Sequence, residues 1–132
     1  MLSFDYNGHR YEQWTEQDAL QAGVPADVIA GAKLKGRRST VSAECRRRIY
    51  AAASVETQMN IATAASVISG KPETDRSEDE NGILAGVGLA LEWVTAMRAN
   101  VDALTADPAA DYQSDAVWPE LPAEVLAVID RY

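Results

Sequence analysis

The chain has 132 residues, of which 47% are hydrophobic, and a formal net charge of −8 at pH 7. This length and apolar content predict one folded domain and exclude global disorder. The negative charge argues against a general nucleic-acid-binding protein, and the single cysteine, Cys45, excludes an internal disulfide.

The charge is unevenly distributed along the chain. Residues 1–50 hold eight Lys/Arg against six Asp/Glu, and residues 51–132 hold four against fourteen, so the halves should attract each other or a neighbouring copy.

Residues 1–14 predict a β-hairpin. Apolar residues alternate along the first strand, at Leu2, Phe4 and Tyr6. Asn7-Gly8 is the strongest short signal for a type I′ turn, and residues 9–14 return with Tyr11 as the apolar contact. Because an isolated two-stranded hairpin is marginal in water, this one must pack on the helices or add a strand to a partner's sheet.

Residues 15–37 predict short helices. Thr15 is placed as an N-cap, with Asp18 at the capping-box position. Gly23 ends that helix, and Pro25 suits the first turn of the next. Gly36 lowers helix stability by about 1 kcal/mol relative to Ala, so we expect a break or bend there.

Residues 38–106 predict an antiparallel helical hairpin. Two apolar-patterned stretches of similar length, 38–69 and 78–106, flank a polar connector that begins with Gly70-Lys71-Pro72. The polar middle of the first stretch predicts a kink or an N-cap at Ser54. The second stretch carries an unbroken four-three seam: Ile83, Val87, Ala90, Val94, Met97, Val101 and Leu104.

Residues 107–132 predict a tail with a short last helix. Asp107-Pro108 ends the long helix. Trp118 should hold the tail against the helical hairpin, and Pro122 can begin the final helix. The expected fold is therefore mainly α, with an N-terminal β-hairpin, a long antiparallel helical hairpin and a short C-terminal helix.

The sequence predicts no signal peptide and no membrane span. The N-terminus lacks a basic start followed by an apolar run. The longest charge-free run of the second long helix, Gly82 to Leu91, is about half of what a span requires. We therefore expect a soluble protein.

No catalytic, cofactor or metal site is predicted. His9 and Cys45 are the only residues of their kinds, and their spacing implies no acid–base partner. The carboxylates of residues 73–80 lack the ligand order and glycine of a calcium-binding EF-hand loop. Gly82, Gly86 and Gly88 indicate close approach of another helix.

Basic residues gather between Lys33 and Arg48. Successive helix residues are 100° apart, so Arg46, Arg47 and Arg48 fan out and cannot all face one ligand. Ion pairing within the fold or across a subunit contact is favoured over nucleic-acid binding, and at least one of the three arginines should lie near the packed side. The candidate partner contacts are Phe4, Tyr6, Tyr11, Trp14, Arg46, Arg47, Gln58, Trp93 and Trp118.

Residues 45–68 carry an Arg-rich helix start that is followed, after about a dozen residues, by Asn60-Ile61 and an Ala-rich helix. This stretch resembles small helical proteins of tailed bacteriophages and prophages, and residues 91–98 look like the second helix of that group. Such proteins are commonly described as tail-fibre assembly or tail accessory proteins. The resemblance covers residues 38–106 and supplies no catalytic residues.

The resemblance implies a non-enzymatic role in a virion or its assembly. The expected partner is a phage tail or tail-fibre protein, and a second copy of this chain in a homo-oligomer is the other partner considered. The expected location is the host cytoplasm during assembly, or the virion tail. The alternative is a regulatory or antitoxin-like helical module that binds nucleic acid through residues 33–48. If a partner docks on the helices, we expect it at the polar middle of the first long stretch and the arginines beside it.

Overall fold

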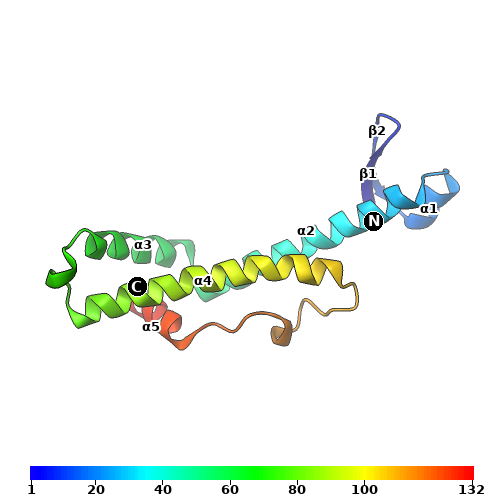
Figure 1. The fold of residues 1–132 in the computed structure, drawn as a ribbon. Coiled ribbons are helices and arrows are strands. Elements are labelled where there is room, and N and C mark those ends of the chain that lie inside the picture. The colour runs from blue at the N-terminus through cyan, green and yellow to red at the C-terminus, as the bar shows by residue number, and fades with distance from the viewer.

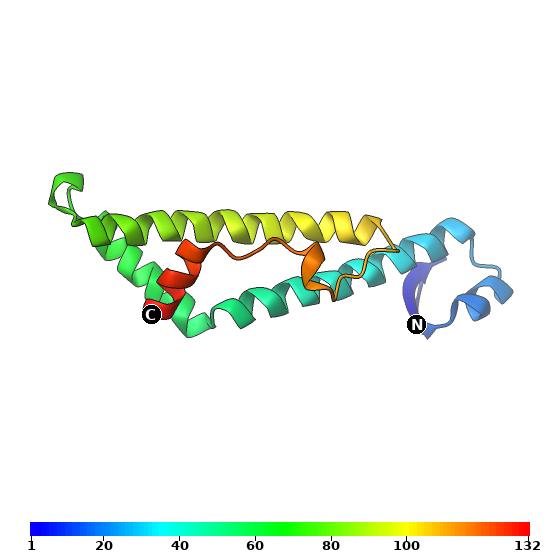
Figure 2. The ribbon, with the colours of Figure 1, turned by 90° about the horizontal axis from the view of Figure 1, so that it is seen from below.

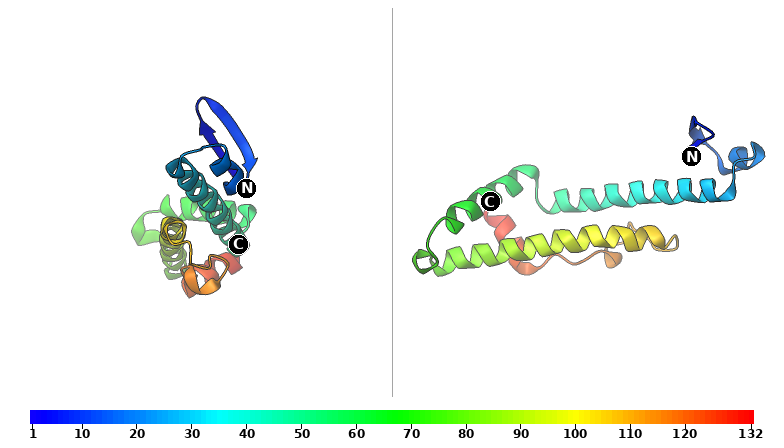
Figure 3. Two further views of the ribbon diagram at one scale, coloured as in Figure 1. Left: turned by 90° about the vertical axis from the view of Figure 1, so that its right-hand side faces the viewer. Right: turned by 45° about the horizontal axis from the view of Figure 1, so that its top comes forward.

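The computed structural model describes residues 1–132 and shows an elongated, mainly helical protein (Figure 1). A β-hairpin and a short helix lie at one end, and two long helices form the body. Figure 3 shows the narrow cross-section of this body when it is viewed end-on. The predicted fold class is confirmed.

The hairpin consists of β1 (Leu2–Tyr6) and β2 (His9–Trp14), paired antiparallel. Asn7 and Gly8 have φ of 50° and 76°, as a type I′ turn requires. Phe4 pairs with Tyr11 but Leu2 pairs with Trp14, so β2 has one extra residue between these pairs. Gln13, at φ 57°, lies in this bulge. The bulge reverses the alternation of side chains, so Trp14 and Tyr11 face the same side and contact each other edge-to-face at 5.0 Å between ring centroids.

A small core joins the hairpin to the helices that follow it. It contains Phe4, Ala19, Val24, Ile29 and Ala32. Helix α1 (Glu16–Gln21) begins after Thr15, whose hydroxyl accepts a hydrogen bond from the Asp18 backbone N–H at 3.0 Å. The predicted N-cap is therefore present, and the hairpin packs on helices of its own chain.

The expected break at Gly36 is wrong. Helix α2 runs without interruption over Ala26–Ala52. Gly36 is exposed and no other group approaches it. Its cost of about 1 kcal/mol is outweighed because the helix packs at its N-terminal end on β1 and along its C-terminal half on α4.

The first arm of the helical hairpin is divided at the predicted polar position. α2 ends before Ala53, which is extended, and α3 spans Val55–Ser69. The Ser54 hydroxyl caps α3 by accepting from the Thr57 N–H at 3.1 Å, and Gln58 Nε2 donates to Ala53 O at 2.8 Å. The first arm is thus two helices at an angle rather than one rod (Figure 2).

The second arm is the single helix α4 (Glu78–Ala106), which matches the predicted range. The connector before it includes a short 3₁₀ helix, η1 (Glu73–Asp75). α4 packs against α2 through a core of Val41, Cys45, Met97, Val101, Leu104 and Trp118. The predicted seam residues Ile83, Met97, Val101 and Leu104 are buried, whereas Val87, Ala90 and Val94 are half-buried.

The tail returns along one side of the α2–α4 pair. It contains the 3₁₀ helix η2 (Asp115–Val117) and ends in α5 (Ala123–Arg131). Trp118 is buried in the core, as predicted, and its Nε1 donates to Tyr112 O at 2.7 Å. In Figure 2, α5 lies in the opening that α2, α3 and α4 outline.

Of the three glycines of α4, only Gly86 permits close helix approach. A Cβ there would overlap Val128 Cγ2 of α5 and come within 3.1 Å of Glu124 O. Gly82 and Gly88 have open space at the same position. The predicted close contact therefore exists, and its partner is the short last helix.

α4 is the one helix that, by length and hydropathy alone, is able to cross a membrane. Its best 18-residue window has a mean hydropathy of 1.3, and 17% of that window is buried in the fold. Its packing against α2, α3 and α5 gives part of this apolar surface a place within the protein. Much of the remainder stays uncovered.

Candidate protein-binding site

The predicted contact residues separate into three groups in the structure. The aromatic side chains of residues 1–14 lie in the hairpin core, Arg47, Trp93 and Trp118 lie on the side of the tail, and Arg46 and Gln58 lie on the opposite side. Only the last two line a cleft away from the tail.

The hairpin aromatic residues hold the hairpin in place. Phe4 is 5% exposed and stacks on Tyr11 with 5.2 Å between ring centroids. Leu2, Tyr6, Tyr11 and Trp14 pack around the same core. What the hairpin leaves available is its backbone, because the sheet has two strands and each has one unpaired edge.

The second group fastens the tail to the long helices. Trp93 Nε1 donates to Pro119 O at 3.1 Å, and Asn100 Nδ2 donates to Val117 O at 2.5 Å. Arg37 donates to three backbone carbonyls at the end of α4 and in the tail, those of Leu104, Asp107 and Ala110. Trp93, which the sequence predicted as a partner contact, is thus engaged within the chain, and Asn100 was not singled out from the sequence.

Arg46, Arg47 and Arg48 point in different directions, as helix geometry predicts. Arg48 points inward, where its Nε donates to Glu44 at 2.8 Å and its Nη1 to Asp115 at 2.7 Å. Arg47 makes two hydrogen bonds to Glu44, at 2.8 and 2.7 Å. The hydrogen bonds from Arg47 lower the pKa of Glu44, against the opposing effect of burial. Arg46 points elsewhere, and its guanidinium lies 5.4 Å from the centre of the Tyr50 ring.

Arg46 lines a groove of about 470 Å³ between α2 and α4. We call this the arginine groove and define it by its lining residues: Arg38, Ser42, Cys45, Arg46, Ile49, Tyr50, Gln58, Val94, Arg98 and Val101. No tail residue and no carboxylate lines it. It therefore occupies the face of the helix pair that the tail leaves uncovered, beside the junction of α2 and α3. In the right-hand view of Figure 3, α2 and α4 run side by side and the tail passes below and partly behind α4.

Most of the basic side chains that are free of a partner in this protein lie at this groove. Three of the twelve Lys and Arg side chains have neither a carboxylate partner nor a hydrogen bond to the protein: Lys35, Arg46 and Arg98. Two of these three line the arginine groove. Arg38, the third arginine of the groove, is paired with Asp102.

Arg98 was not identified from the sequence. It is the only Lys or Arg within 78–106, and it lies four residues after Val94 and three before Val101 of the seam. That position was the available signal, but only the packing of α4 against α2 brings Arg98 opposite Arg46.

An apolar cavity adjoins the groove where α2 and α3 meet. It has a volume of about 190 Å³, and Ile49, Gln58 and Val94 line both spaces. α4 and α5 complete its wall, which includes the exposed Leu91. The arginine groove thus adjoins an apolar cavity that α5 of the tail encloses on its other side.

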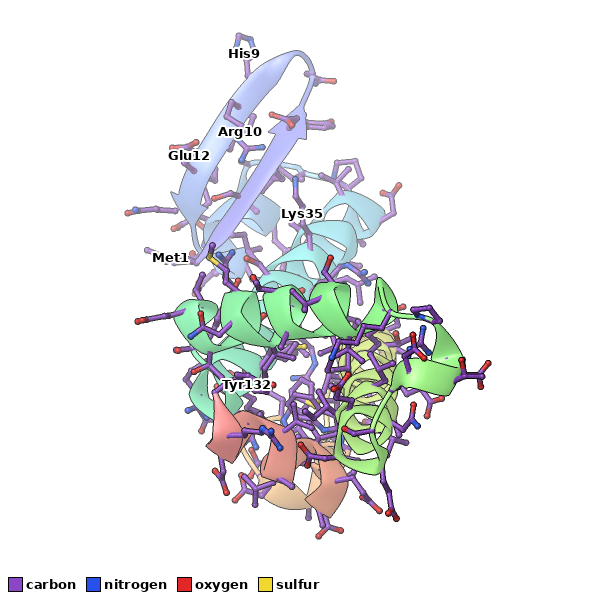
Figure 4. All side chains as sticks on the ribbon, turned by 90° about the vertical axis from the view of Figure 1, so that its left-hand side faces the viewer. Met1, His9, Arg10, Glu12, Lys35 and Tyr132 are labelled. Carbon is purple, nitrogen blue, oxygen red and sulfur yellow. The ribbon has the colours of Figure 1, made fainter.

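The two residues considered for catalysis lie in unrelated places. Cys45 is 4% exposed, and burial raises the pKa of its thiol, an effect that the charge of Arg98 opposes. His9 follows the hairpin turn and projects at its tip, away from the helices (Figure 4). No group of three or more His, Cys, Asp or Glu side chains is placed to hold a metal ion.

No protein-family model matches the chain, and no characterised protein sequence matches it significantly.

Proposed function

We propose that this chain is a non-enzymatic bacteriophage tail or tail-fibre associated protein. It serves as a structural component or an assembly chaperone, and it works through protein–protein contacts in the host cytoplasm during assembly. The resemblance of residues 45–68 and 91–98 to small helical phage proteins supports the class of partner. The geometry of the fold supports the mode of action.

The observation that carries this proposal is the accessible surface. The chain exposes 8593 Å², whereas a compact monomer of 14.3 kDa exposes about 6,800 Å². The excess of about 1,800 Å² is roughly twice what one partner contributes to a standard protein–protein interface. An elongated body with this much uncovered surface suits a protein that is completed by its partners.

Exposed apolar side chains indicate where part of that surface lies. Val55 and Met59 of α3 are 57% and 65% exposed, and Leu91 of α4 is 66% exposed. Val55 and Met59 are four residues apart and so share one face of α3, while other exposed apolar side chains, Met1, Leu20 and Leu34, lie at the hairpin end. Exposed apolar groups that share a face in this way are typical of interaction surfaces.

The nucleic-acid alternative receives less support from the side chains. Of the seven Lys and Arg residues from Lys33 to Arg48, five are engaged in ion pairs or in hydrogen bonds to backbone carbonyls. Lys35 and Arg46 remain, within a protein of net charge −8. A duplex would meet repulsion over most of the surface.

Co-purification tests the proposed function. We expect a tagged chain to recover virion tail proteins from phage-producing cells and not from uninfected cells grown in parallel. The reason is that contacts made during assembly persist through mild washing when the interface is of standard size or larger. Recovery of host metabolic enzymes alone, without any virion protein, contradicts the proposal.

A further inference from the structure

We propose that the arginine groove binds an acidic amphipathic helix of a partner protein. The inference deepens the proposed role in protein–protein contact and rests on it for the class of partner. It commits to one occupant, which is a helix with apolar residues on the side that enters the groove and Asp or Glu residues along its flanks.

The shape of the groove favours a helix. α2 and α4 pack side by side and antiparallel, and the tail covers only one face of the pair. Two neighbouring helices with an open furrow between them accept a third helix, whose side-chain ridge enters the furrow. On the covered face the tail, through Trp118, already fills the equivalent position.

The floor requires apolar side chains from the occupant. Cys45 and Val101 are buried, and Ile49 and Val94 are half-buried at the base of the groove. The adjoining cavity extends this floor towards Val87 and Ile61. Apolar residues spaced at i, i+3 or i+4, and i+7 on an incoming helix form a stripe that covers such a floor.

The rim requires negative charge. Arg46 and Arg98 lie on opposite helices, α2 and α4, and neither is paired with a carboxylate, although the protein holds twenty Asp and Glu residues. Contact with the Tyr50 ring holds the Arg46 guanidinium in place. An acidic partner is repelled by most of this protein and attracted here, so the charges select this groove and orient the incoming helix.

Nucleic acid fits the same groove less well. Phosphates would satisfy the arginines, but a duplex offers no apolar stripe for Ile49, Val94 and Val101, and the net charge of −8 opposes its approach. A protein helix satisfies both the rim and the floor.

The test uses a synthetic 18-residue helical peptide of defined chemistry. Leu residues form one face, Glu residues flank it, and the ends are capped; a matched peptide carries Lys in place of every Glu. Binding is measured by fluorescence anisotropy with the full chain. We expect the Glu peptide to bind, the Lys peptide not to bind, and the affinity of the Glu peptide to fall as salt is raised.

Charge reversal locates the binding site. The double variant Arg46→Glu, Arg98→Glu should weaken binding of the Glu peptide by about tenfold or more, since attraction becomes repulsion on both rims. Lys35→Glu is the matched control, because it reverses the remaining free cation, which does not line the groove, and it should change the affinity by less than about twofold. Circular dichroism establishes that each variant is folded.

Three outcomes overturn the inference: no binding of the Glu peptide, equal binding by the wild type and the double variant, or equal weakening by Lys35→Glu. A 20-base-pair DNA duplex is tested in parallel, and DNA binding that the double variant abolishes would replace the helix with nucleic acid. Failure here is distinct from failure of the proposed function. If the double variant still co-purifies with tail proteins as the wild type does, the proposed function stands and the groove is not its site.

Discussion

The contact between α4 and α5 yields a prediction in which neighbouring glycines respond in opposite directions. Replacing Gly by Ala in a helix ordinarily stabilises a protein by about 0.5–1 kcal/mol. At Gly88 the added Cβ meets open space, so Gly88→Ala should show this gain. At Gly86 the added Cβ overlaps Val128 Cγ2 and comes within 3.1 Å of Glu124 O.

The magnitude at Gly86 follows from what has to move. Val128 is β-branched, so its χ1 has little freedom within a helix, and the carbonyl of Glu124 belongs to the α5 backbone. α5 must therefore shift as a unit, and overpacking of this kind costs about 1–3 kcal/mol. After subtraction of the helix-propensity gain, Gly86→Ala should be neutral to destabilising by up to about 2.5 kcal/mol, and about 1–3 kcal/mol less stable than Gly88→Ala.

Thermal unfolding of the two variants measures this difference. For a chain of 132 residues, 1 kcal/mol shifts Tm by about 3–4 °C. We expect Gly88→Ala to raise Tm by about 2–4 °C and Gly86→Ala to melt about 4–11 °C below it. Adding Val128→Ala should reduce the extra cost of Gly86→Ala, because the γ methyl group that the Cβ overlaps is then absent. Equal Tm values for the two glycine variants would refute the reasoning.

Two further predictions concern ionisable groups. Because burial raises the pKa of the Cys45 thiol, a thiol reagent at pH 8 should label the folded protein much more slowly than the protein in denaturant; equal rates would contradict the burial of Cys45. The pKa of Glu44 is lowered by the hydrogen bonds from Arg47, so its contribution to stability is present above the unfolded-state pKa of about 4.3 and is lost as the pH falls through the lower folded-state pKa. Denaturant titrations from pH 6 to pH 3 should therefore show a smaller acid loss of stability for Glu44→Gln than for the wild type, and an unchanged loss would mean that the pair contributes nothing.

The arginine groove shows how much of a candidate site can be predicted from residues alone. Because Arg46, Arg47 and Arg48 are consecutive residues of a helix, the sequence indicated that they point in different directions. The polar stretch at Ser54 indicated a break in the helix beside them. Arg46 and Gln58 were predicted as partner contacts, and both line the groove. Arg98 was not predicted as a contact residue. Its position opposite Arg46 depends on the register between α2 and α4, and the spacing of residues within one helix does not determine that register.

The hairpin illustrates a similar limit. Alternating residues and Asn7-Gly8 were sufficient to predict the strands and their turn. The bulge at Gln13 was not predictable, because it follows from the packing of Trp14 with Phe4 and Tyr11 above α1 and α2. A left-handed φ at a residue other than glycine is acceptable there because tertiary contacts compensate for its cost.

Local signals in the sequence alone determined the type of each main element and several of its boundaries. The caps at Thr15 and Ser54 act within about three residues, and the seam of α4 repeats within one helix, so both can be predicted along the chain. The tertiary structure decided whether Gly36 interrupts a helix, which glycine of α4 allows the close approach of α5, and which arginines lie on opposite sides of the groove. Each of these outcomes depends on contacts between segments distant in sequence, and such contacts outweigh local preferences of about 1 kcal/mol.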